Sequence, residues 1–291
     1  MKPEDFWRIE PPYQEQYDKY VAIGRESAAR SSVCFLAIAR DAMPFLENTL
    51  VLLEETAGFF KSASLYVYEN DSTDGTTQML TSFAESRPWA THEHATLHRP
   101  DYRGFEEDRT IALAEYRNRC RRWAVQNAPD CDFVVVIDMD PTGGFSPEGV
   151  LNSIGWLDAY GTEQCRSLRP GGMASVSLWA STHAEQEGAI RVMQYDAWAA
   201  RLNWWEDRRQ HGWFHELLPP VGSEPIPINS AFGGLAVYRS QAFFADGVEY
   251  VGGDCEHVAL HKTMRQAGYQ MYLNPGCRYA AVIPHGVAAQ D

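Results

Sequence analysis

Short apolar runs and helical periodicities alternate along the first half of the chain. Residues 33–39, 65–68 and 133–137 are continuous apolar runs, which are typical of strands covered on both faces. Residues 44–55 and 110–126 instead repeat apolar side chains at helical spacing. This alternation predicts an α/β fold with a mostly parallel central sheet and helices on both faces.

The pattern becomes less regular after residue 141. A further helix is predicted at residues 257–267, and three more strands at residues 174–179, 233–238 and 269–273. The chain shows neither an internal repeat nor a low-complexity segment, which favours one continuous domain over two independent ones.

We therefore expect an N-terminal arm with one short helix over residues 1–30, and a single Rossmann-like domain over residues 31–291. Within that domain, residues 31–145 hold the regular strand–helix alternation and residues 146–291 the irregular remainder. Ligands of open α/β sheets bind at the carboxyl ends of the strands, so we expect the first half to carry the principal ligand site.

Composition and charge limit the possible partners. The 291 residues are 45% apolar and 22% charged, as in an ordinary folded protein. The net charge of −14 disfavours nucleic acid as a partner. The six cysteines lack Cys-x-x-Cys spacing, so a structural zinc site is not predicted. The chain has no signal-like apolar core and no transmembrane segment, so we expect a cytoplasmic protein and leave peripheral membrane attachment open.

Two carboxylates leave the third apolar run. Asp138 and Asp140 follow residues 133–137 directly, at the edge of the sheet where ligands bind. Acidic groups beside a buried strand need compensation, and Mn²⁺ or Mg²⁺ together with a diphosphate would supply it. A solvated acidic pair at a strand end is the alternative that this motif alone leaves open.

The second apolar run continues into a polar segment, residues 68–76, with the sequence Tyr-Glu-Asn-Asp-Ser-Thr-Asp-Gly-Thr. We expect Ser72 or Thr73 to cap a helix that begins near Thr76. Arg40 directly follows the first run, and its charge there needs a partner such as a phosphate.

The second half offers two candidate blocks. Gly233 and Gly234 open a predicted strand, where such a pair indicates either close approach to a ligand or room for packing. Asp254 and Glu256 stand at a predicted helix start, where the helix dipole stabilises carboxylates. Aromatic side chains that could stack on sugar rings, or simply pack in the core, are Trp198, Trp204, Trp205, Trp213 and Phe214.

The order of these blocks resembles the nucleotide-binding half of GT-A glycosyltransferases. The run at residues 68–76 is similar to that of the fungal capsule-associated α-1,3-mannosyltransferases. A looser similarity to family-2 glycosyltransferases rests on Glu256, which stands twelve residues before Gly268, where that family has an acidic pair; His257 replaces the second acid here. The resemblance covers roughly residues 32–286. It implies that residues 31–145 are the nucleotide-sugar-binding half of the domain and residues 146–291 the acceptor-binding half.

The resemblance implies a metal-dependent hexosyltransferase with a UDP- or GDP-sugar donor and a glycan or glycoconjugate acceptor. A nucleotide-sugar-binding protein without turnover and a glycosyltransferase acting on modified DNA bases are the alternatives. The likeness of residues 68–76 to the capsule mannosyltransferases favours a retaining reaction, whereas the family-2 spacing of Glu256 favours an inverting one. We expect retention, because His257 interrupts the acidic pair of the inverting family.

The resemblance also implies site residues. Asp140 and His285 would bind Mn²⁺ or Mg²⁺, and Glu256 and Asp254 would be the catalytic carboxylates. The implied donor-binding residues are Ala37, Arg40, Glu69, Asn70, Asp71, Arg117, Asn118, Asp138, Gly233 and Gly234.

Overall fold

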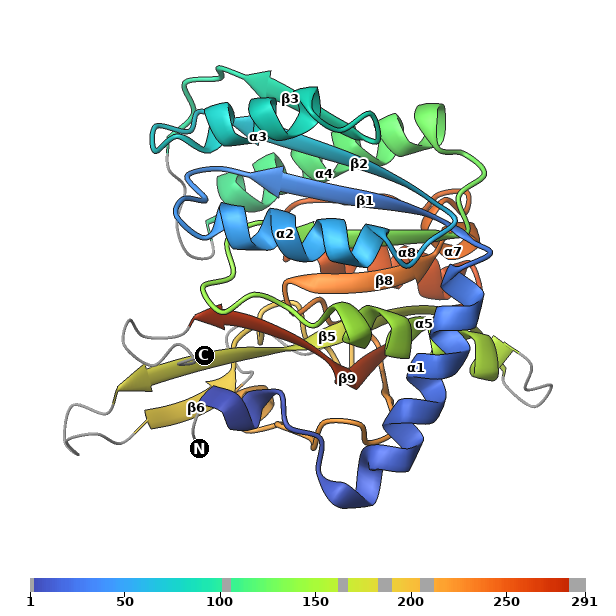
Figure 1. Ribbon diagram of the computed structural model, residues 1–291. Coiled ribbons are helices and arrows are strands. Elements are labelled where there is room, and N and C mark those ends of the chain that lie inside the picture. The colour runs from blue at the N-terminus through green and yellow to red at the C-terminus, as the bar shows by residue number, and fades with distance from the viewer. Residues whose placement is uncertain (1–2, 101–105, 162–166, 183–189, 205–211, 283–291) are drawn as a thin grey trace.

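A computed structural model describes residues 3–100, 106–161, 167–182, 190–204 and 212–282 (Figure 1). The strands are β1 (Ser32–Ala39), β2 (Ser62–Asn70), β3 (Ala90–Ala95), β4 (Phe133–Asp138), β5 (Arg169–Thr182), β6 (Ile190–Gln194), β7 (Ile226–Ile228), β8 (Leu235–Arg239) and β9 (Tyr269–Val282). The helices are α1 (Gln14–Ala28), α2 (Leu46–Ala57), α3 (Thr76–Glu85), α4 (Glu107–Asn127), α5 (Pro147–Gly161), α6 (Gly212–His215), α7 (Ser240–Phe243) and α8 (Glu256–Gln266), with short 3₁₀ turns at Pro3–Phe6 and Pro11–Tyr13.

All of these strands belong to one mixed sheet with the order β3-β2-β1-β4-β8-β5-β9-β7, and β6 pairs with β5. Strands β1 to β4 pair in parallel, as do β5 and β9. Strand β8 is antiparallel to both of its neighbours, and β6 and β7 are antiparallel to β5 and β9. Strands β1 to β5 and β9 therefore share one direction, which confirms the expected α/β fold with a mostly parallel sheet.

Helices cover both faces of this sheet. Alternate side chains of β1 enter opposite layers, because successive residues of a strand point to opposite faces. Phe35 packs with apolar residues of α1, α2, α3 and α5. Leu36 belongs to the layer that contains α4, α7 and α8. Two faces buried in this way explain why β1, β2 and β4 are nearly continuous apolar runs.

The N-terminal segment, expected as an arm with one short helix, packs on the domain through a longer helix. Helix α1 is 15 residues long and crosses α5 at a glycine contact. A Cβ atom on Gly24 would lie 1.8 Å from the carbonyl oxygen of Leu151, and one on Gly155 would lie 2.0 Å from that of Tyr20. The Tyr20 ring also stacks on Trp156, with centroids 3.5 Å apart. Helix α1 is therefore part of the layer on that face.

The later strands differ from their predicted limits for local reasons. Strand β8 begins at Leu235 rather than at residue 233, because Gly233 and Gly234 have φ angles of +70° and +78°. Strand β3 and helix α5 were not predicted. Strand β3 has the sequence Ala-Thr-His-Glu-His-Ala, so it lacks an apolar run. No described helix is both long enough and apolar enough to cross a membrane.

Candidate functional site

The two carboxylates of the Asp-Met-Asp segment stand at the carboxyl edge of β4. The N–H of Asp138 donates to the Gly234 carbonyl at 2.8 Å, and its own carbonyl accepts from the Tyr279 hydroxyl at 3.2 Å. Met139 is buried, which anchors the segment in the core. Asp140 follows with an exposed side chain.

Asp140 lies in an unfavourable electrostatic setting for an anion. The side chain reaches solvent, but protein atoms surround the carboxylate on most sides and partly desolvate it. Desolvation and the neighbouring Asp138 carboxylate together raise the pKa of Asp140 to about 6. A cation bound here would relieve both effects.

Asp138 and Asp140 are the described carboxylates that a metal at this edge would use. The described residues include no group of three or more His, Cys, Asp or Glu side chains that could hold a metal. His285, the expected second ligand, lies outside the described residues. Two carboxylates with donor phosphate oxygens are nevertheless a donor set that Mg²⁺ and Mn²⁺ accept, so Asp138 and Asp140 fit a cation that is shared with a diphosphate.

Arg117 joins the two halves of the site. Its Nη2 donates to Asp138 Oδ1 at 2.9 Å and its Nε donates to Glu256 Oε1 at 2.8 Å. Burial acts to lower the pKa of Arg117, but the two carboxylates more than offset this and raise it. The side chain, which was expected at the nucleotide, instead binds one acidic group from β4 and one from α8.

The two expected catalytic carboxylates differ in accessibility. Glu256 is 2% exposed and lies against Arg117. The side chain of Asp254 is 44% exposed, and both of its oxygens accept from Nη2 of the buried Arg201, at 3.0 and 2.9 Å. Only Asp254 of this pair is open to a second molecule.

His257, which stands where family-2 enzymes have their second acid, is a buried ring. It stacks on Phe232 with centroids 3.7 Å apart. Desolvation, with a further contribution from the charge of Arg117, holds the pKa of His257 well below its usual value. The nearby His261 is buried between Ser230 and Tyr238, and desolvation lowers its pKa to about 3. Both rings are therefore neutral at physiological pH.

Close packing against neighbouring protein atoms explains why two glycines precede β8. A Cβ atom on Gly233 would lie 2.2 Å from the Ser175 carbonyl oxygen, and one on Gly234 would lie 2.3 Å from the Tyr279 ring. Of the two explanations left open for these glycines, the structure supports packing room. The N–H of Gly233 also donates to Asp196 Oδ2 at 2.8 Å.

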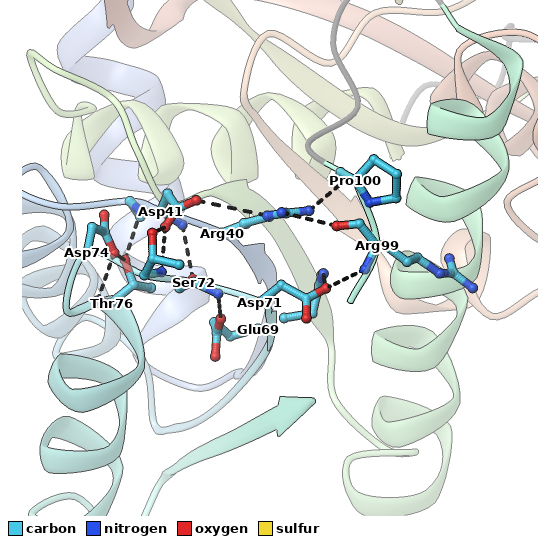
Figure 2. A network of polar contacts seen from close by, with 12 residues as sticks. Arg40, Asp41, Glu69, Asp71, Ser72, Asp74, Thr76, Arg99 and Pro100 are labelled. Carbon is cyan, nitrogen blue, oxygen red and sulfur yellow. Dashed lines mark hydrogen bonds and ion pairs between the residues drawn. The ribbon is translucent and has the colours of Figure 1, made fainter. Parts of the chain in front are cut away.

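Strands β1 and β2 end in a network of internal hydrogen bonds (Figure 2). The expected capping by Ser72 or Thr73 is wrong: Asp74 accepts the N–H of Thr76, and it also accepts that of Met43. Asp41 accepts the N–H of Thr73 at 2.7 Å, which ties the end of β1 to the turn after β2.

Arg40 and Asp71 hold the segment that follows β3. Arg40 donates to the carbonyls of Arg99 and Pro100 at 3.3 and 3.0 Å (Figure 2). Asp71 accepts the N–H groups of residues 97–99. Partial desolvation acts to raise the pKa of Asp71, but these bonds and one from Asn70 outweigh it and lower the pKa to about 2. Both expected donor-binding side chains are thus occupied by the chain itself.

Four other expected donor-binding residues are directed into the protein. Ala37 and Glu69 are fully buried, and Glu69 accepts from Ser72, Thr77 and His94. Asn70 is also buried, and its amide donates to Asp71. The amide of Asn118 exchanges two hydrogen bonds with the backbone of Tyr250, at 2.7 and 3.0 Å. These four residues therefore support the edge of the sheet through contacts inside the protein.

Sequence reasoning gave no role to Arg201 or Asp196. Desolvation raises the pKa of Asp196 to about 6, and the charges of Asp138 and Glu256 add to this. The only available signal was indirect: both residues lie in an aromatic segment, where an isolated charge needs a partner.

No protein-family model and no curated protein sequence matches this chain. Solved structures do match its fold. The mannosyltransferase PcManGT from Pyrobaculum calidifontis, in complex with GDP-Man and Mn²⁺, aligns with a TM-score of 0.52 and 15% identity over 95% of this chain and 67% of that protein.

Two further matches are more distant. TarS of S. aureus, as its 1–349 fragment, has a TM-score of 0.47 and 10% identity, covering 86% of this chain and 60% of that one. GalNAc-T7 with UDP, GalNAc and Mn²⁺ has a TM-score of 0.45 and 10% identity, covering 89% and 45%. The chain thus spans 45–67% of the lengths of these three structures. The first match identifies the fold as one like that of GT-A glycosyltransferases.

Proposed function

We propose that this chain is a metal-dependent glycosyltransferase that moves a hexose from a UDP- or GDP-sugar to a glycan or glycoconjugate. The observation that carries the proposal is the pair Asp138 and Asp140 at the carboxyl edge of β4, in a fold like that of GT-A glycosyltransferases. The Pyrobaculum enzyme, whose structure contains GDP-Man and Mn²⁺, supports the same donor class and cation here. The similarity of residues 68–76 to the fungal mannosyltransferases makes GDP-mannose the first donor to test.

Asp140, with Asp138 beside it, would hold Mn²⁺ or Mg²⁺ together with the donor diphosphate, and His285 is the candidate for a further ligand. When bound, the cation stabilises the charge that develops on the departing diphosphate. Arg117 fixes the orientation of the Asp138 carboxylate. Asp138 can thereby serve the cation or the donor sugar without moving.

In the transfer, the acceptor oxygen forms a bond to the anomeric carbon while the bond from that carbon to the diphosphate oxygen breaks. The nucleoside diphosphate leaves with the electron pair. The acceptor proton goes to a carboxylate base in an inverting enzyme, or to the departing diphosphate in a retaining one. We favour retention, because the buried neutral His257 replaces the second acid of the inverting family.

Of the two candidate catalytic carboxylates, Asp254 is the one that we assign to face the acceptor. Glu256 is buried and hydrogen-bonded to Arg117. Glu256 then acts through Arg117 as a positioning residue. Proton NMR of the first-formed product gives the stereochemistry. An inverted product together with an inactive Asp254→Asn variant would make Asp254 the base and overturn retention.

The central test combines binding and turnover. Mn²⁺ with GDP or UDP should raise the melting temperature, and EDTA should abolish that shift together with hydrolysis of the matching sugar donor. Asp140→Asn should lose the shift while its own melting temperature without ligand is maintained. Unchanged nucleotide binding in EDTA and in Asp140→Asn would refute the metal role. Binding without hydrolysis or transfer would instead support a nucleotide-sugar-binding protein without turnover.

A further inference from the structure

An exposed aromatic pair lies on the second half of the sheet. Trp179 is 38% exposed and Tyr195 is 49% exposed. Trp179 belongs to β5, and Tyr195 follows β6, the strand paired with it. The rings meet edge to face, with centroids 6.3 Å apart and an interplanar angle of 86°. Core packing therefore does not explain these two rings.

Backbone contacts bring this pair close to the carboxylates of the site. Trp179 is in register with Val282 at the end of β9. The preceding residue of β9, Ala281, accepts the N–H of Thr142, which lies two residues after Asp140. Trp179 is thus joined to the Asp140 segment through one strand.

A second connection starts at Tyr195. Its neighbour Asp196 accepts the N–H of Gly233, and the next residue, Gly234, accepts the N–H of Asp138. Desolvation raises the pKa of Tyr195, and the charges of Asp196, Asp138 and Asp140 raise it further while that of Arg109 opposes them. The phenol therefore lies within the electric field of the same carboxylates.

From this juxtaposition we infer that Trp179 and Tyr195 form a platform for a neutral carbohydrate acceptor. A pyranose ring packs its C–H face on an aromatic ring, and its hydroxyls can donate to carboxylates at the rim. This inference rests on the proposed glycosyltransferase function and specifies its acceptor class.

The charge at this edge argues against an anionic acceptor. The charges of Asp196, Asp138 and Asp140 act on Tyr195 and are opposed there by Arg109, while Arg117 is already paired with carboxylates. A divalent cation with a donor diphosphate adds roughly no net charge, so the carboxylates still dominate the field. A phosphorylated lipid or acidic glycan would be repelled, whereas sugar hydroxyls would be accepted.

The test uses neutral disaccharides of glucose, mannose and galactose, each compared with its 6-phosphate. Saturation-transfer NMR, with diamagnetic Mg²⁺ and GDP or UDP present, should detect the neutral sugars and weakly or not at all their phosphates. Trp179→Ala and Tyr195→Ala should each raise the dissociation constant for the neutral disaccharide by about tenfold. Val125→Ala is the control, because Val125 is also exposed but lies near the end of α4, a helix that packs on β1 and β2.

Nucleotide binding, measured on the same variants by calorimetry, separates this inference from the proposed function. Tighter binding of the phosphates, or wild-type disaccharide binding by both alanine variants, would overturn the platform even if nucleotide binds. Absence of nucleotide binding together with loss of disaccharide binding in the alanine variants would preserve the platform and refute the transferase.

Discussion

At the scale of single residues, the main question is how charges are tolerated inside this protein. Arg117 is 6% exposed and lies between Asp138 and Glu256, while Arg201 is 1% exposed and holds Asp254. A buried ion needs a partner, so removal of one member leaves the other in an unfavourable position. The same two arginines orient three of the carboxylates to which we assign function.

Replacing Arg117 tests this dependence. Arg117→Met should lower the free energy of unfolding by about 3–5 kcal/mol, because Glu256 becomes an unpaired buried charge. The double variant Arg117→Met/Glu256→Met should lose less than the single variant. Urea titrations measure both, with the exposed Arg122→Met on the same helix as the control. A loss below about 1 kcal/mol in the single variant would contradict the ion-pair account.

His257 gives a prediction about pH. Its folded-state pKa lies well below the unfolded value of about 6.5, so only the unfolded chain takes up the proton as pH falls through that value. The free energy of unfolding should therefore fall by about 1.4 kcal/mol per pH unit for this ring below pH 6.5. His257→Leu should make that decline shallower between pH 6 and pH 5. At pH 7 it should change stability little, because neither ring nitrogen has a hydrogen-bond partner among the described residues. An unchanged pH slope would count against the buried neutral ring.

The sequence predicted which residues gather at the edge of the sheet better than it predicted what each one does. The apolar run before Asp138 is sufficient to place that carboxylate at a strand end. Whether Arg117 faces a ligand or Glu256 depends on how α4 packs against α8. The two residues are 139 positions apart in the sequence. Asp71 and Arg40 were similarly recognisable as polar groups at strand ends, but their partners lie in residues 97–100, which have no periodic pattern.

At the scale of elements, the contact between α1 and α5 decides how the N-terminal segment packs. Gly24 and Gly155 let the two helix backbones approach each other without an intervening side chain. Sequence periodicity could not reveal this, because glycine carries no apolar signal and lowers helix propensity. The polar residues of α1 therefore suggested an arm, whereas backbone contact and the Tyr20–Trp156 stack fix it to the domain.

Gly24→Ala should separate these helices. The new methyl group would overlap the Leu151 carbonyl, and overpacking of this kind destabilises by about 1–3 kcal/mol, which outweighs the gain of about 1 kcal/mol in helix propensity. Gly161→Ala at the end of α5 is the matched control, since its nearest neighbour is the tip of Arg239 at 3.4 Å. Thermal and urea unfolding compare them. Equal stabilisation by both substitutions would show that the crossing is loose.

At the scale of the whole molecule, β8 connects the two halves of the sheet. It lies between β4 and β5 and pairs with both, so the first four strands continue into the later ones without a break. A sheet interrupted by a domain boundary would lack this ladder. The molecule should therefore unfold in one transition.

Val237→Ala tests this coupling. Val237 is fully buried in β8 and in register with Val135 of β4, so its truncation should cost about 1–3 kcal/mol. Hydrogen exchange of the slowest amides should accelerate by the same factor in β1 and β2 as in β5. The exposed Val51→Ala should leave exchange unchanged. Acceleration confined to β5 and β9 would show that the two halves open independently.

The position of β8 also has a consequence for synthesis on the ribosome. Strands β1, β2 and β4 are complete once residue 138 has emerged, but the free edge of β4 waits for residues 235–239. At about 5–20 residues per second, translation of the intervening hundred or so residues takes roughly 5–20 seconds. During that time the nascent chain presents an unpaired, Val-rich edge, which is a template for wrong pairing with another chain. Chaperones that bind nascent chains should therefore affect the yield of folded protein more than its final stability.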